Sequence, residues 1–410
     1  MVQTKIDKEI YKLIKEKKFH AVSSSFTPEE EMSIRRHVLE SLTKKELKNI
    51  GSPVFDIKSV SSKNCENLIG KVEIPLGITG PLKINGDYVS GEVFVPLATT
   101  EGALVASVNR GCKAISDAGG GHTFIEQSGM TRAPLFLTKN LRQTKDFISF
   151  IKSHFKEIAR KVQSTDSHLT LISITPHIAG RNVYLRFVFD TGDAMGMNMV
   201  TFACDYVIKK YIEKETKVPC IALSGNLCTD KKASWLNKIE KRGHSVHADV
   251  VIPKEVVKKV LKTNPADFVE VQIRKNLVGS ALSGSLGFNS HHANIIAALF
   301  LATGQDMAHV VEGSSGMTTA ELVDGGLYVS VSLPDLPIGT IGGGTGLETQ
   351  KEALAILGVV GGGKPAGSNA KKFAEIIAAT VLAGEISLIA ALSSGDLAKA
   401  HKRLGRGEKI

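Results

Sequence analysis

The sequence predicts a multidomain α+β protein in which a large domain surrounds a long central buried helix and a smaller α+β domain is inserted. Its length of 410 residues suggests two or three domains and is sufficient for a large core. Residues 272–312 contain no proline, and from Ala293 to Ala302 they are almost wholly small or apolar, which is typical of a helix buried on all sides. Strand and helix patterns alternate over residues 133–222, which indicates a separate unit.

Polar residues interrupt the central stretch in clusters that include Lys275, Asn294, Asp306 and His309. Polar and charged groups rarely lie in a buried helix unless they are paired or functional. We therefore expect this stretch to form part of the core and, at the same time, a wall of the active site.

Residues 1–68 are predicted to form an N-terminal helical domain. Ile6, Ile10 and Leu13 fall on one helical face, and the segment from Thr27 to Glu30 is a start signal for a second helix. A helical cap or an oligomer contact is the expected role.

Residues 69–132 are expected to begin the large domain. The β-branched runs 72–78 and 88–95 predict two strands, and Asn85-Gly86 is a strong hairpin signal between them. After Leu97 the pattern changes to a helix capped by Thr99 or Thr100, with Glu101 in its first turn. A favourable interaction with the helix dipole explains Glu101 more readily than catalysis does, on these residues alone.

Residues 133–222 are expected to form the inserted small domain. Helices are predicted over 144–162 and 195–212, and strands over 169–174 and 183–189. The segment 193–199 links strand to helix, and a helix N-terminus there would suit a phosphate. Methionines in such a segment, considered alone, more often pack in a hydrophobic core than bind a cofactor.

Residues 223–410 are expected to complete the large domain. Residues 223–236 form a polar connector with two adjacent lysines, for which a solvated surface and a functional loop are equally good interpretations. The glycine-rich run 339–346 offers backbone amides that could hold an anion or simply form tight turns. An apolar helix over 371–392 precedes a basic tail, in which His401 could donate a proton near neutral pH.

Composition and motifs exclude several classes of protein. The chain has 51 basic and 41 acidic residues, a net charge of +10, but the basic residues are scattered and only 6% of residues are aromatic, which argues against nucleic-acid binding and leaves an anionic small molecule. Five cysteines without paired spacing fit a reducing cytoplasm. Neither a signal peptide nor a run of about 18 apolar residues is expected, so a membrane is not a predicted partner.

No metal site is expected, because His291-His292 and His244-x-x-His247 lack the cysteine or carboxylate spacing of a zinc site. No nucleophile elbow of a serine hydrolase is present either. The proton-handling groups that remain are Glu101, Lys231, Asp306 and His401.

Six motifs, which occur in order between about residues 64 and 401, together resemble 3-hydroxy-3-methylglutaryl-coenzyme A (HMG-CoA) reductases. These motifs are Glu66 to Pro81, Ala98 to Gly102, Asp193 to Met199, Asp230 to Lys232, Gly304 to Asp306 and Gly339 to Gly346. The match is most similar to the class I, archaeal-type enzymes, which lack a membrane anchor. It implies two NADPH-dependent hydride transfers that convert the thioester to mevalonate and free coenzyme A, in a fold whose small domain is ferredoxin-like.

The resemblance implies a role for each proton-handling group. Lys231 resembles the lysine that stabilises the oxyanion, and Asp306 resembles the carboxylate that pairs with it. Glu101 resembles the general acid of the aldehyde reduction, for which burial beside Asp306 would have to keep it protonated. His401 resembles the residue that protonates the departing thiolate.

Binding roles follow from the same resemblance. The expected clamp on the free carboxylate of the substrate consists of Arg132, Ser224, Lys232 and Lys275, while Asn294 would orient the catalytic lysine, and Ser107, Asn109 and Arg110 would lie on the coenzyme A side. The expected NADPH-binding residues are Asp193, Ala194, Met195, Gly196, Met197, Asn198, Gly342, Gly343 and Gly344.

The segment expected to meet the 2′-phosphate, residues 165–168, lacks the arginine of eukaryotic relatives, and its Asp166 would repel a phosphate. NADPH remains the expected cofactor, with Arg406 in place of the missing arginine as the contact to the 2′-phosphate. The family further implies a homodimer or a tetramer of paired dimers with the active site at the interface. Two alternatives stay open, namely NAD-dependent mevalonate degradation and a non-catalytic acyl-CoA-binding protein.

Overall fold

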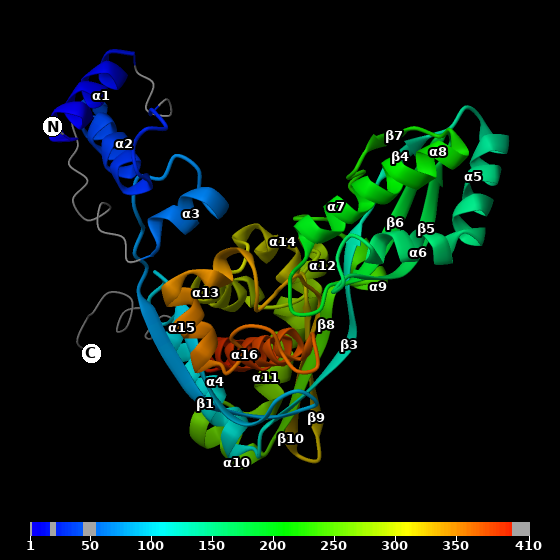
Figure 1. The fold of residues 1–410 in the computed structure, drawn as a ribbon. Helices are drawn as coiled ribbons and strands as arrows, with labels where there is room; N and C mark the ends of the chain where they lie inside the picture. The colour runs from blue at the N-terminus through cyan, green and yellow to red at the C-terminus, as the bar shows by residue number, and fades with distance from the viewer. Residues whose placement is uncertain (1, 17–21, 44–54, 396–410) are drawn as a thin grey trace.

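The computed structural model describes residues 2–16, 22–43 and 55–395 (Figure 1). N-terminal helices lie at the upper left of this view, a small α+β unit lies at the upper right, and a larger sheet with its helices lies below and between them. His401 and Arg406, to which the resemblance gave roles, lie outside the described residues.

The N-terminal helices form where the sequence predicts them. They are α1 (Val2–Glu16), α2 (Pro28–Thr43) and α3 (Ile57–Lys63). Thr27 and Glu30 begin α2 with a reciprocal pair of bonds: the Glu30 N–H donates to Thr27 Oγ1 over 3.3 Å, and the Thr27 N–H donates to Glu30 Oε2 over 2.8 Å. Leu13, Ile34 and Val38 form a small separate core between α1 and α2.

The large sheet has the strand order β2–β1–β3–β8–β10–β9. These strands are β1 (Leu76–Gly86), β2 (Ser90–Ala98), β3 (Gly121–Arg132), β8 (Arg242–Ile252), β9 (Met317–Val323) and β10 (Gly326–Leu336). All neighbours are antiparallel except β1 and β3. The predicted hairpin is confirmed, since Asn85 pairs with Ser90 across the β1–β2 turn, although the first strand begins at Leu76 rather than Val72.

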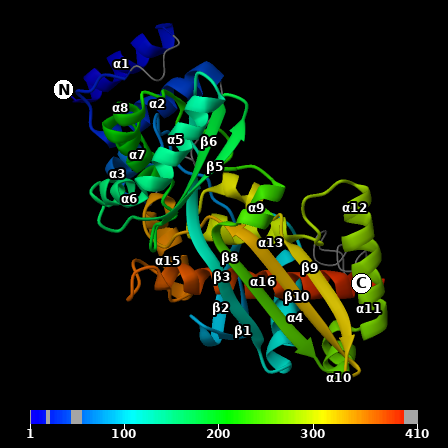
Figure 2. The same ribbon diagram turned by 90° about the vertical axis from the view of Figure 1, so that its right-hand side faces the viewer.

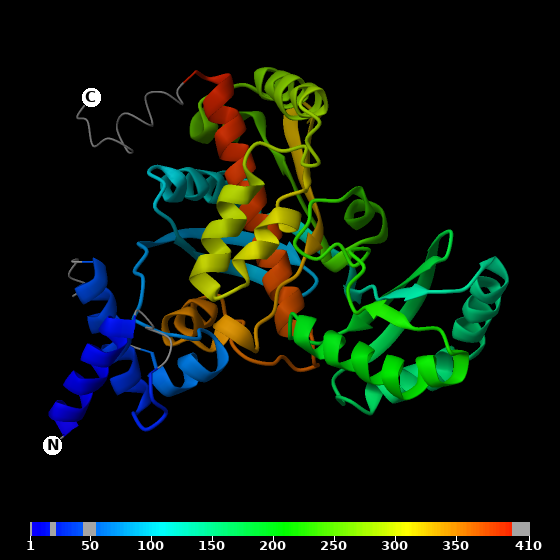
Figure 3. The ribbon, with the colours of Figure 1, turned by 90° about the horizontal axis from the view of Figure 1, so that it is seen from above.

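Helix α16 (Ser368–Ser393) is the long buried helix of the molecule and packs on β3, β8 and β10 (Figure 3). Helix α4 (Leu104–Asp117) lies against it, and a Cβ on Gly111 would stand 1.9 Å from Ala383 O, so only glycine permits this approach. By length and composition α16 could cross a membrane, contrary to the sequence-based expectation, but 83% of its most apolar window is buried inside the protein. It is therefore a core helix.

The central stretch 272–312 is not one long helix, so this part of the prediction is wrong. It contains η3 (Gln272–Gly279), α12 (Ser280–Leu282), α13 (His292–Thr303), η4 (Met307–His309) and α14 (Val310–Gly313). Gly284 and Gly304 both adopt φ of 70°, a left-handed conformation that ends a helix. Only α13 is buried as expected, and α16 takes the central position.

The small unit has the ferredoxin-like order β–α–β–β–α–β, and its antiparallel sheet runs β7–β4–β6–β5 (Figure 2). Its elements are β4 (Leu135–Leu137), α5 (Leu141–Ser153), α6 (Phe155–Gln163), β5 (Thr170–Ala179), β6 (Asn182–Asp190), α7 (Met197–Val207), η1 (Ile208–Ile212), α8 (Glu213–Thr216) and β7 (Cys220–Ala222). Its core is separate from that of the large sheet and includes Phe136, Phe187 and Phe189. Strand β3 joins the two sheets, because its end at Arg132 pairs with Phe187 of β6.

The remaining elements cover the large sheet and its edges. They are α9 (Trp235–Glu240), α10 (Lys254–Val256), η2 (Val257–Leu261), α11 (Pro265–Val271), η5 (Gly343–Gly346) and α15 (Glu348–Ile356). Asn264 caps α11 through the Asp267 N–H, as the Asn264-Pro265 pair predicts.

Candidate active site

A cavity of about 680 Å³ lies where the small unit meets the large sheet and the end of α13. Two segments predicted to hold a cofactor lie side by side in its wall, since Ala194 pairs with Ile341 in a parallel bridge. The Thr340 N–H donates to Asp193 O over 2.8 Å. A Cβ on Gly339 would stand 2.4 Å from Met195 N, so this close backbone contact requires glycine.

The glycine-rich run also contacts the segment that carries Asp306. Gly342 and Gly343 have φ of 80° and 55°, and η5 follows as a single tight turn. A Cβ on Gly304 would stand 2.2 Å from Gly344 O. The end of α13 and the glycine-rich turn are therefore in direct backbone contact, and both line the cavity.

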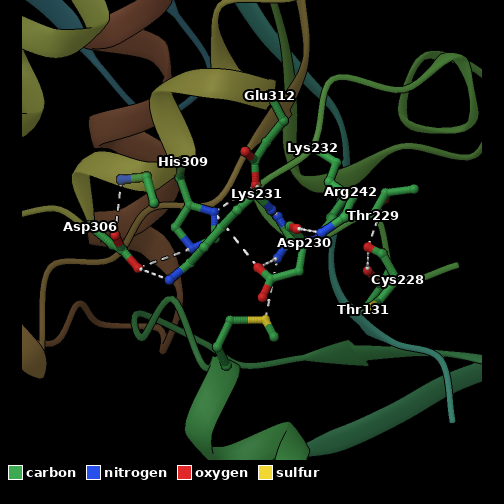
Figure 4. A network of polar contacts seen from close by, with 12 residues as sticks. Thr131, Cys228, Thr229, Asp230, Lys231, Lys232, Arg242, Asp306, His309 and Glu312 are labelled. Atoms are coloured by element: carbon green, nitrogen blue, oxygen red, sulfur yellow. Dashed lines mark hydrogen bonds and ion pairs between the residues drawn. The ribbon is translucent and has the colours of Figure 1, made fainter. Parts of the chain in front are cut away.

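Lys231 and Asp306 meet in this cavity, with Lys231 Nζ 2.8 Å from Asp306 Oδ2 (Figure 4). The hydrogen bond to Asp306 raises the pKa of Lys231. Partial burial opposes ionisation of Asp306, but the bonds from Lys231 and from the Ala308 N–H outweigh it and lower the pKa of Asp306. The arrangement favours an ammonium and a carboxylate, both partly open to solvent.

The loop that carries Lys231 is strained. Asn226, Thr229 and Lys231 have φ of 64°, 56° and 56°, in the left-handed region that non-glycine residues rarely adopt. Such conformations persist where surrounding bonds over-determine them. One of these bonds runs from the Lys231 N–H to Glu312 Oε1 over 3.0 Å.

A wholly buried arginine stabilises this loop by bonding to two carboxylates. Arg242 at the start of β8 donates to Asp230 Oδ1 over 2.8 Å and to Glu312 Oε1 over 2.9 Å, and it lies 3.7 Å from Asp335 (Figure 4). Asp230 is also 4.0 Å from Arg132. Arg242 and Glu312 were not predicted from the sequence; Arg242 follows the charged residues Glu240 and Lys241, so its sequence context does not mark it as buried.

Asp230, His309 and Glu312 bring potential metal-ligand atoms within 4.8 Å of one another. However, the guanidinium of Arg242 already bonds to both carboxylates. This cation supplies the positive charge that a metal ion would bring, so the cluster fits an ion-pair network better than a metal centre.

Comparison with known proteins identifies the family. A family model described as hydroxymethylglutaryl-coenzyme A reductase matches residues 31–406. The chain belongs to this family. The 3-hydroxy-3-methylglutaryl-coenzyme A reductase of Pyrococcus abyssi is 53% identical over 375 residues, which cover 91% of this chain and 92% of that protein. That of Methanothermobacter thermautotrophicus is 49% identical over 391 residues, covering 95% and 97%.

A solved structure gives the same fold. The class II 3-hydroxy-3-methylglutaryl-CoA reductase from Streptococcus pneumoniae, bound to NADPH in open conformations, superposes with a TM-score of 0.63 at 20% identity and covers 96% of this chain and 97% of that chain. The α+β architecture of this HMG-CoA reductase family member is thereby confirmed.

Glu101 and Asn109 line a second pocket of about 420 Å³, not the cavity of Lys231. The predicted helix start is wrong: α4 begins at Leu104 after Ala103, which has φ of 74°, and Glu101 lies exposed in the preceding turn. The Glu101 N–H donates to Thr99 Oγ1 over 3.0 Å. Within one chain Glu101 is therefore not buried beside Asp306, as its expected protonation required.

The residues predicted for the coenzyme A side lie along α4 and bond within the chain. Asn109 Oδ1 accepts from the Gly80 N–H over 3.0 Å. Ser107 Oγ lies 2.9 Å from Ser387 Oγ on α16, and Arg110 donates to the carbonyl of Ser387 over 2.6 Å. The contacts of Ser107 and Arg110 hold α4 against α16, and that of Asn109 holds it against β1.

Lys275 and Asn294 line a third pocket, of about 640 Å³. Burial lowers the pKa of Lys275, whose Nζ donates to Asn276 Oδ1 over 3.0 Å. The buried Glu385 of α16 shapes this pocket by accepting from the Ser290 N–H over 2.8 Å. The predicted site residues therefore fall in three different pockets of one chain: Lys231 and Asp306 in the first, Glu101 and Asn109 in the second, and Lys275 and Asn294 in the third.

Of the remaining predicted clamp residues, Arg132 lines the Lys231 cavity. Ser224 Oγ contacts Cys228 Sγ over 3.1 Å, and Lys232 Nζ donates to Asp230 O over 3.3 Å. Both lie on the same strained loop as Lys231, so their positions depend on its conformation.

Among the residues predicted to bind the cofactor, Asp193 differs from the rest. Its side chain is buried and accepts from the N–H groups of Gly363 and Gly367, both over 2.8 Å, and of Ala370 over 2.9 Å. Its carboxylate therefore anchors the small unit to the start of α16 and has little capacity left for a ligand. The segment Ala194–Asn198 lines the cavity itself.

Proposed function

We propose that the protein reduces HMG-CoA to mevalonate and free coenzyme A with two equivalents of NADPH. Each hydride transfer to a carbonyl carbon creates an oxyanion that needs a proton, so two hydrides and two protons are consumed per thioester. The observation that carries the proposal is the Lys231–Asp306 pair, which faces a cavity walled by the 194–198 segment and the glycine-rich turn.

Lys231 is the group proposed to stabilise the oxyanion, because its ammonium is both bonded to Asp306 and partly exposed to the cavity. Asp306 keeps that ammonium charged. Glu101 and His401 are proposed as proton donors to the aldehyde and to the departing thiolate, in line with the family resemblance.

NADPH is the proposed source of both hydrides. A pyrophosphate fits bare backbone amides, which the positive-φ glycines Gly342 and Gly343 and the N-terminus of α7 offer on adjacent walls. The similar enzyme from Streptococcus pneumoniae was solved with NADPH bound. In our proposal Gly344 and residues 194–198 complete the cofactor contacts and Arg406 reaches the 2′-phosphate.

We further propose that the working protein is a homodimer or a tetramer of paired dimers, with the active site shared between subunits. The support is that Glu101, Lys231 and Lys275 line three separate pockets in one chain. Exposed apolar side chains such as Ile78 and Leu282 lie near the second and third pockets and suit burial against a second subunit.

The domain division proposed is residues 1–68, residues 69–132 with 223–410, and residues 133–222. The two separate cores of the large sheet and the small unit support it. A cytoplasmic, membrane-free location is proposed from the burial of α16 and from the unpaired cysteines among the described residues.

The decisive experiment follows the absorbance of the reduced nicotinamide in parallel cuvettes with NADPH and NADH, each with the purified protein and HMG-CoA. Faster oxidation of NADPH is the expected result. Preference for NADH would favour mevalonate degradation, and no turnover with either cofactor would favour a non-catalytic acyl-CoA-binding protein.

A further inference from the structure

His309 lies next to the Lys231–Asp306 pair and lines the same cavity. Its side chain is completely buried, and its ring joins two carboxylates (Figure 4). Nδ1 lies 2.6 Å from Glu312 Oε1, while Nε2 lies 3.6 Å from Asp306 Oδ2. Neither the resemblance nor the motif analysis gives this residue a role.

The contacts of Glu312 determine how the ring is oriented. Glu312 Oε1 already accepts from the Lys231 N–H over 3.0 Å and from Arg242 over 2.9 Å, so this oxygen serves as an acceptor. Nδ1 of His309 must therefore donate to it. This bond fixes the ring plane and leaves Nε2 directed at Asp306.

Nε2 has no hydrogen-bond partner within the described part of the chain, although it is fully buried. A buried polar nitrogen without a partner is costly, and natural structures rarely keep one without a reason. A bare lone pair there would face the oxygen of an ionised Asp306, whereas an N–H would donate to it. The distance of 3.6 Å is slightly too long for a hydrogen bond, but such bonds often tighten only when substrate is present.

We propose that His309, held by Glu312, is a positioning residue that donates from Nε2 to Asp306 and fixes this carboxylate against Lys231. The proposal rests on the proposed reductase function and extends it. Within the described residues, the side chain of Asp306 otherwise has one restraint besides Lys231, the Ala308 N–H. A further restraint from His309 keeps the ammonium of Lys231 pointed at the position where the oxyanion forms.

The charged groups around His309 all belong to this network. Asp230 lies 3.9 Å from Nδ1, Asp306 and Glu312 face the two nitrogens, and Arg242 neutralises Asp230 and Glu312 from the far side. Both ring nitrogens therefore face carboxylate oxygens, which accept hydrogen bonds.

The test compares His309→Leu, which removes the donor, with His309→Gln, whose amide can still donate to Asp306. We expect His309→Leu to lower kcat about 100-fold with KM for HMG-CoA changed less than about threefold, and His309→Gln to keep kcat within about tenfold of wild type. His244→Leu is the matched control, because His244 is a buried histidine outside this network.

A second readout needs no turnover. Trace acetylation of lysines in the full-length protein, followed by mass spectrometry of the 223–236 segment, reports how readily Lys231 loses its proton. In His309→Leu this reactivity should rise by up to about tenfold, because a displaced Asp306 stabilises the ammonium less.

Wild-type kcat and unchanged Lys231 reactivity in a folded His309→Leu protein would overturn the proposal. A second result would also overturn it: equal losses of kcat in the Leu and Gln variants, accompanied by a loss of thermal stability like that of His244→Leu. A purely structural role predicts that pattern. Absence of turnover in the wild-type protein would instead contradict the proposed function, and the acetylation result would still decide the role of His309.

Discussion

Arg242 donates through Nη1 to Glu312 Oε1 over 2.9 Å, and both side chains are completely inaccessible to solvent. The same guanidinium holds Asp230 at 2.8 Å, one residue before Lys231. A buried arginine that serves two carboxylates keeps the lysine loop in its strained conformation. Removing one partner of such a network is far more destabilising than the net contribution of the network suggests, because it leaves buried charges uncompensated.

We therefore expect Arg242→Met to lower the free energy of unfolding by about 3–5 kcal/mol and to abolish activity. Urea denaturation followed by circular dichroism measures the first effect, and the nicotinamide assay measures the second. Arg160→Met is the control, because Arg160 forms an exposed ion pair with Glu157 and its loss should leave the urea midpoint unchanged. A urea midpoint equal to that of the wild type for Arg242→Met would show that the network does not contribute to stability.

Local patterns explain what could be predicted from the sequence. The hairpin at Asn85-Gly86, the start of α2 at Thr27 and the two central strands of the small unit depend on turn chemistry and periodicity within short windows, and all were predicted. The ferredoxin-like order of the small unit was predicted only through the resemblance. The meeting of Lys231 and Asp306 was predicted only through the resemblance, since they lie 75 positions apart in the sequence.

The wrong or missing predictions concern features that depend on tertiary contacts rather than on local sequence. The breaks at Gly284 and Gly304 depend on positive φ, which an apolar pattern does not reveal. The Arg242–Glu312 pair joins residues 70 positions apart, and neither residue belongs to a recognisable motif. Asp193 was assigned to the cofactor because of its neighbours, but three backbone N–H groups from the start of α16 occupy its carboxylate.

Asp193→Ala should lower the free energy of unfolding by roughly 3 kcal/mol, because three buried N–H groups lose a charged acceptor. It should also weaken NADPH binding, since the neighbouring Ala194 and Gly339 form the cavity wall. Urea denaturation and quenching of NADPH fluorescence measure these effects. Asp190→Ala is the matched control, as Asp190 is exposed and, among the described residues, its side chain accepts from the Gly192 N–H alone. Equal effects of the two substitutions would contradict an anchoring role for Asp193.

Glu101→Gln and Lys231→Met should each lower thioester reduction by at least about 100-fold, because each removes one proton-handling group from the proposed site. The two residues line different pockets of one chain. If the site is shared between subunits, unfolding and refolding an equal mixture of the two inactive variants should restore about a quarter of wild-type activity. This fraction arises because half of the dimers are mixed and each mixed dimer has one intact site.

The control is each variant refolded alone, which should remain inactive. A refolded mixture without activity, from variants that refold to native-like dimers, would place Glu101 and Lys231 in a site formed by a single subunit. It would also remove the support that the separate pockets give to an interfacial active site.

His292 should make stability depend on pH between about pH 4 and about pH 6.5. Burial lowers the pKa of His292 from its ordinary value of 6.5 to about 4. Within this range the unfolded chain binds a proton that the folded protein does not, so the free energy of unfolding falls as the pH falls. The full effect is roughly 3 kcal/mol for a shift of this size. Above about pH 6.5 both states are neutral and the dependence disappears.

Urea denaturation of the wild type and of His292→Asn at a series of pH values isolates this contribution. The variant should be less stable at neutral pH, because the ring loses its contact with Thr318 and leaves a cavity. Its stability should nevertheless fall less steeply below about pH 6.5, since one depressed histidine is gone. The buried Asp335, whose pKa burial raises, contributes equally to both proteins and cancels in the comparison. Parallel curves for the two proteins would show that His292 is not held neutral in the folded state.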